Sequence, residues 1–120
     1  MMIAALSALT LLAMPLPHQD PADLDQTILC ASVAASEISN LNRYAESRPL
    51  TAQEQAHLAT MQTILNAGVS ALNAWRATAA PAEVEALRQR VEPRTIALDT
   101  GPMADWNAEV DRCVTLLGAA

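Results

Sequence analysis

One segment of the chain carries three metal-binding side-chain types at helical spacing. Glu54, His57 and Met61 follow one another at intervals of three and four residues, and residues so spaced share one face of an α-helix. A carboxylate, an imidazole and a thioether on one face are candidate metal ligands. Glu-x-x-His is also a ligand pair of di-iron helical bundles, but those bundles carry the pair twice together with two more glutamates. This chain has one copy, and its only other histidine is His18, so we expect no metal and no other cofactor.

Other familiar catalytic patterns are missing from the sequence. The chain has no GxSxG-like serine, no CxxC pair and no CxxCH haem motif. It also has no lysine, and its formal net charge is −6. An acidic chain without a basic patch is poorly suited to neutralising phosphates, so nucleic acids and anionic membrane surfaces are not expected partners. The sequence predicts no catalytic residue.

The first residues resemble an export signal. Residues 3–13 form an uncharged apolar run, which is too short for a membrane span of about 20 residues and has the length of a signal-peptide hydrophobic region. We therefore expect a signal peptide over 1–13, a flexible mature N-terminus over 14–19 and a single helical domain over 20–120. No Lys or Arg precedes the run, so the alternative is an N-terminal helix of a cytoplasmic protein.

Four amphipathic segments follow, and their composition favours helices. Alanine, the best helix former, is abundant, whereas Phe is absent and aromatic residues make up 2% of the chain. Capping signals and Pro or Gly breaks place the helices at about 20–47, 51–77, 81–98 and 102–118. Thr51 and Glu54 form a capping box in sequence, and we expect Pro93 to shorten or kink the third helix. The predicted core faces are Leu24, Ile28, Ala31, Ala35 and Ile38; Leu58, Met61, Leu65, Gly68, Leu72 and Trp75; Val84, Leu87 and Val91; and Met103, Trp106, Val110, Cys113 and Leu117.

These segments predict an all-α fold, a small antiparallel four-helix bundle with one disulfide. In such a bundle the start of the first helix lies beside the end of the last, and Cys30 and Cys113 lie at depths that agree within about one helical turn. If the protein is exported, the oxidising environment would convert this pair of thiols to a disulfide. Trp75 and Trp106 are expected in the core at opposite ends of the bundle, with Trp75 at the same end as the disulfide. Each tryptophan would line an apolar pocket if the helices diverge at its end.

The sequence thus indicates a small periplasmic or secreted helical protein. We expect a non-enzymatic binding or protein-interaction module of the bacterial envelope, because the sequence predicts export, a disulfide and helices but contains no recognisable group of catalytic residues. A small-ligand or metal-binding bundle that uses Glu54, His57 and Met61 is the first alternative. A small enzyme of undefined class is the second.

Overall fold

The computed structural model describes residues 21–118, which form four helices connected by short turns. They are α2 (Pro21–Ser47), α3 (Ala52–Arg76), α4 (Pro81–Thr100) and α5 (Met103–Leu117). The predicted all-α bundle and its disulfide between Cys30 and Cys113 are confirmed. The expected signal peptide over 1–13, the segment 14–19 and His18 lie outside the described residues.

Local sequence signals set the ends of the helices. The Thr51 hydroxyl accepts a hydrogen bond from the Glu54 backbone N–H, and the Glu54 carboxylate accepts one from the Thr51 N–H, which completes the predicted capping box of α3. At the start of α4, Glu83 accepts a hydrogen bond from the backbone N–H of Ala80. Gly101 and Pro102 separate α4 from α5. Because these caps satisfy orphan backbone groups, the chain turns where the sequence predicts.

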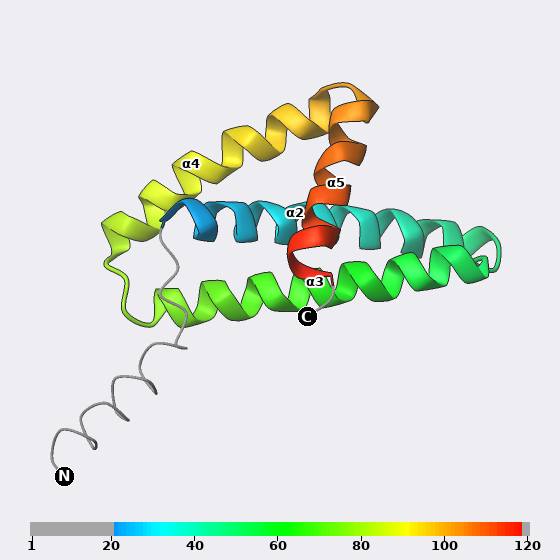
Figure 1. Ribbon diagram of the computed structural model, residues 1–120, viewed down its shortest axis with the longest axis horizontal. Helices are drawn as coiled ribbons and strands as arrows, with labels where there is room; N and C mark the ends of the chain where they lie inside the picture. The colour runs from blue at the N-terminus through cyan, green and yellow to red at the C-terminus, as the bar shows by residue number, and fades with distance from the viewer. Residues whose placement is uncertain (1–20, 119–120) are drawn as a thin grey trace, which may run out of the picture.

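The central element is α2, which contacts each of the other three helices. Figure 1 shows α3 antiparallel to α2 on one side and α4 on the other, while α5 crosses steeply from the end of α4 towards the middle of α3. The tip of the α2–α3 hairpin extends beyond α4 and α5 (Figure 1). The region between this hairpin arm and the α4–α5 corner therefore has fewer helices around it than the rest of the bundle.

The core consists of two clusters of buried side chains along α2. The first surrounds the disulfide and contains Cys30, Val33, Ala34, Met61, Ile64, Val110 and Cys113. The second joins α2 to α4 and contains Leu24, Leu29, Leu87 and Val91. Since α2 is covered on several sides, its buried arc is wider than the single predicted face. The prediction therefore missed Leu29, Val33 and Ala34, and it was wrong for Ala35, which is exposed.

Gly68 permits the close contact between α2 and α3. A Cβ built on Gly68 would lie closer than 3.0 Å to the Cβ of Ala31 and 3.2 Å from the carbonyl oxygen of Thr27. The two backbones therefore meet at a distance that only small residues allow. This contact confirms the prediction that Gly68 lies on the core face of its helix.

Pro93 lies inside α4 without ending it. The helix continues from Pro81 to Thr100, although proline has no N–H to donate to the carbonyl four residues earlier. That carbonyl belongs to Gln89, which is exposed and can be solvated. Within the described residues, no helix is both long enough and apolar enough to cross a bilayer.

Candidate functional site

The disulfide fixes the position of α5 against α2. The Sγ atoms of Cys30 and Cys113 are 2.10 Å apart and their Cα atoms 5.4 Å apart, and both residues are buried. Trp106 precedes Cys113 by two helical turns, so the two side chains share a face of α5. The Trp106 side chain packs against the disulfide cluster. A covalent bond at one point of α5 thus helps to orient an aromatic ring at another.

Beyond Trp106 lies a half-open cavity of about 510 Å³. It occupies the region between the hairpin arm and the α4–α5 corner, and we call it the distal cavity. Its wall from α2 and α3 comprises Ser36, Glu37, Ser39, Asn40, Leu41, Arg43, Tyr44 and His57. Its wall from the α4–α5 corner comprises Leu98, Asp99, Gly101, Met103, Trp106 and Asn107. The volume lies within the roughly 300–1,000 Å³ of pockets that hold small organic ligands.

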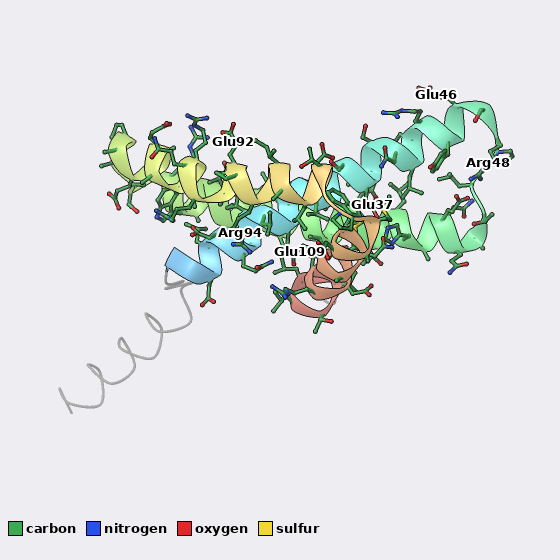
Figure 2. All side chains as sticks on the ribbon, turned by 90° about the horizontal axis from the view of Figure 1, so that it is seen from above. Glu37, Glu46, Arg48, Glu92, Arg94 and Glu109 are labelled. Carbon is green, nitrogen blue, oxygen red and sulfur yellow. A yellow bond between two sulfur atoms is a disulfide. The ribbon has the colours of Figure 1, made fainter. Side chains whose placement is uncertain are left out.

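A histidine–glutamate contact joins two elements of this cavity. His57 Nε2 of α3 lies 3.1 Å from Glu37 Oε1 of α2, and both side chains are partly exposed. Glu37, labelled in Figure 2, lines the same cavity as the corner residues Gly101 and Met103. The contact bridges α2 and α3, so it braces one wall and leaves a polar edge facing the cavity.

The apolar part of the cavity is formed by Leu41, Leu98, Trp106, Tyr44 and Met103. Leu41 is buried and Trp106 partly buried, whereas Tyr44 is 50% and Met103 70% exposed. The inner apolar side chains are therefore covered by protein, and the mouth has accessible apolar side chains. Met103 was predicted to belong to the core, and this prediction was wrong because α5 begins at the corner, where none of the helices within residues 21–118 covers its first turn.

The three candidate metal ligands have separate roles. The Glu54 carboxylate receives two hydrogen bonds of 2.8 Å from Arg48 and also belongs to the capping box. The Arg48 hydrogen bonds are the main reason that the pKa of Glu54 falls from 4.5 to about 2. His57 contacts Glu37 on α2, and Met61 is buried in the disulfide cluster. Among residues 21–118, no group of three His, Cys, Asp or Glu side chains could hold a metal ion.

The two tryptophans differ from their predicted places. Trp106, not Trp75, packs against the disulfide cluster, because α5 crosses α2 instead of running along its whole length. Trp75, near the C-terminal end of α3, packs instead against the second core cluster, which contains Leu24 and Leu87. The smaller apolar groove nearby, of about 360 Å³, is lined by Ile28, Ser32, Leu72, Arg76, Val84, Leu87, Arg88, Val91, Glu92 and Thr95. Of the two tryptophans, only Trp106 belongs to the lining of the distal cavity.

A polar cluster lies beside the disulfide and is internally satisfied. Gln26 donates hydrogen bonds of 3.4 Å to Glu109 Oε2 and to Cys30 Sγ, and its own oxygen accepts one of 3.1 Å from Arg94. Arg112 lies 3.6 Å from Glu109. Figure 2 shows Arg94 and Glu109 on the same side of the bundle. Because each group already has a partner, we assign this cluster to the packing of α2, α4 and α5.

Most cavity residues other than His57 and Trp106 were missed by sequence reasoning. Glu37 and Arg43 of α2 and Asp99 of α4 belong to no recognisable motif, and only the packing of whole helices brings them to one cavity. Tyr44 was a usable signal, because an aromatic residue is rare in this chain and this one lies outside every apolar stripe. Comparison with protein-family models, curated proteins and solved structures finds no match.

Proposed function

We propose that this protein is an exported, non-enzymatic binding module and that the distal cavity is its binding site. The observation that carries the proposal is the cavity itself, which combines apolar surface at Leu41 and Trp106 with a polar edge at His57 and Glu37. Small-ligand sites combine apolar surface with polar groups that fix the orientation of the ligand, and the lining of this cavity provides both kinds of surface. The disulfide supports export, because such bonds persist in oxidising compartments.

The test uses N-phenyl-1-naphthylamine, a neutral apolar fluorophore, with the cavity blocked in one variant. Ser39 lines the cavity on an exposed stretch of α2, so Ser39→Trp fills it with little risk to folding. Ser70→Trp is the matched control, because Ser70 is exposed on α3 and lies outside the lining. We expect Ser39→Trp to weaken dye binding at least about tenfold and Ser70→Trp to leave it unchanged. Absence of dye binding, or equal binding by both variants, would contradict the proposal.

Export is tested separately by the mass of the protein recovered from the cell envelope. The expected species begins after Ala13 and gains two alkylated thiols only after reduction. A protein that keeps its first residues and whose cysteines react without reductant would contradict export.

A protein partner at the same cavity is the second candidate. The exposed apolar side chains at its mouth, Met103 and Tyr44, favour it, because interfaces are enriched in aromatic residues and methionine. A photo-crosslinker at position 103 should then trap one envelope protein, and a crosslinker at Ser70 should not. Recovery of the uncrosslinked protein alone would exclude this candidate.

A further inference from the structure

The charged groups around the distal cavity are paired unevenly. All basic side chains of the chain apart from the histidines are arginines, and most have acidic or amide partners. These partners are Glu54 for Arg48, Glu85 and Glu92 for Arg88, Asp25 for Arg90, Gln26 for Arg94, and Glu109 for Arg112. Arg43 and Arg76 have no such partner within residues 21–118. Arg43 lines the distal cavity, which thus contains an available guanidinium.

The opposite wall carries an available carboxylate. Asp99 of α4 lines the cavity and has no hydrogen-bond or ion-pair partner among the described side chains. Glu37, in contrast, already contacts His57. Asp99 also lies in the last turn of α4, where no basic residue is present. A helix C-terminus has partial negative charge and free carbonyl groups, so this corner attracts a cation more strongly than one carboxylate would.

From this arrangement we infer the chemical class of the ligand, an inference that rests on the proposed function. The geometry points to a small zwitterion with an apolar body, such as an apolar α-amino acid. Its carboxylate would pair with Arg43, its ammonium group with Asp99 and the end of α4, and its apolar part with Trp106. Guanidinium–carboxylate and ammonium–carboxylate hydrogen bonds are among the stronger polar contacts in proteins.

The alternatives to a zwitterion fit the cavity less well. A simple organic anion would be opposed by Asp99 and by the net charge of −6. A simple amine would bring a second cation to a cavity that already contains Arg43. A neutral apolar molecule would use the Trp106 side and leave both charged groups without a new partner. Only a ligand that carries both a negative and a positive group gives both Arg43 and Asp99 a partner of opposite charge.

The test compares three compounds that share a phenyl ring on a short alkyl chain and differ in which charged groups they carry. They are L-phenylalanine, 2-phenylethylamine and 3-phenylpropionate. Binding is followed by the fluorescence of Trp106 in a Trp75→Phe background, in which Trp106 is the only tryptophan. We expect phenylalanine to bind about tenfold more tightly than either analogue, because each analogue lacks one charge-assisted contact.

Two variants assign the contacts to the two walls. Arg43→Gln should weaken phenylalanine binding about tenfold without weakening phenylethylamine binding, and Asp99→Asn should weaken phenylalanine binding without weakening phenylpropionate binding. Arg76→Gln and Asp105→Asn are matched controls, because both residues are exposed and neither lines the distal cavity. They should change no affinity. All four substitutions are at exposed positions, so folding is not at risk.

The outcomes separate this inference from the function on which it depends. Equal affinity for the three compounds, or equal loss in the controls, would overturn the zwitterion assignment. If none of the three binds while the naphthylamine dye still does, the ligand class is wrong and the binding function stands. If neither the dye nor the phenyl compounds bind, both proposals fail.

Discussion

Gly68→Ala tests the packing of α2 against α3, and the structure determines whether this substitution raises or lowers the stability of the protein. In an exposed helix the substitution would stabilise the protein, because alanine exceeds glycine in helix propensity by about 1 kcal/mol. At Gly68 the new methyl group would overlap the Cβ of Ala31 and approach the carbonyl oxygen of Thr27 to 3.2 Å. Neither obstacle is the end of a flexible side chain, so α2 and α3 would have to separate.

The expected magnitude follows from these opposing effects. Forcing an extra methyl group into a packed core costs about 1–3 kcal/mol, and the overlap at Ala31 places this site near the upper end. Subtracting the gain of about 1 kcal/mol in helix propensity leaves a net loss of about 1–2 kcal/mol. For a domain of this size the loss corresponds to a fall in Tm of roughly 4–16 °C.

Thermal and urea unfolding of the oxidised protein, followed by circular dichroism, would measure the change. The double variant Ala31→Gly/Gly68→Ala is the control, because it moves the methyl group from α2 to α3 and keeps the summed helix propensity constant. It should recover most of the stability lost by Gly68→Ala. A Tm above that of the wild type for Gly68→Ala alone, or no recovery in the double variant, would refute the close approach of the two backbones.

Three further changes test other parts of the fold. Replacing Cys30 and Cys113 by alanine should lower the free energy of unfolding by about 4–5 kcal/mol, because the bond closes a loop with a sequence separation of 83; denaturant unfolding that matches the oxidised wild type would contradict this. Glu54→Gln should lower the free energy of unfolding at pH 6, because the contact with Arg48 stabilises the protein only while Glu54 is ionised. The difference in stability between variant and wild type should therefore vanish as the pH falls from about 4.5 through about 2. Urea midpoints at several pH values would measure it, and a difference independent of pH would count against the ion pair. Pro93→Ala should raise the free energy of unfolding by about 1–3 kcal/mol, because it restores a helix donor at an exposed position, and a lower Tm would show that the proline ring has a packing role.

Local signals explain why much of the fold was predictable. Thr51 with Glu54, and Gly101 with Pro102, act within a few residues of themselves, so their effect can be read without knowing the tertiary structure. The disulfide was also predictable, because the order and lengths of the helices restrict where Cys30 and Cys113 can lie.

The distal cavity was less predictable because it depends on how whole helices cross. The steep path of α5 places Trp106 beside the disulfide and leaves Met103 exposed, and no local pattern encodes a crossing angle. The same applies to Asp99 and Arg43, which lie on different helices and share no motif. The face periodicity of α2 was misleading for a related reason, since a helix covered on several sides buries residues outside a single stripe.

The bond between Cys30 and Cys113 also has a mechanical consequence. It converts most of the folded domain into a covalent ring, which includes the turns at 48–51 and 77–80. A single proteolytic cut in either turn would leave both fragments attached to each other. Tension applied to the two ends of the chain would pass from α2 to α5 through the sulfur atoms and bypass the loop between them. The walls of the distal cavity from α3 and from the α4–α5 corner lie within this unstrained loop, so they would keep their places under a pull that frays both termini.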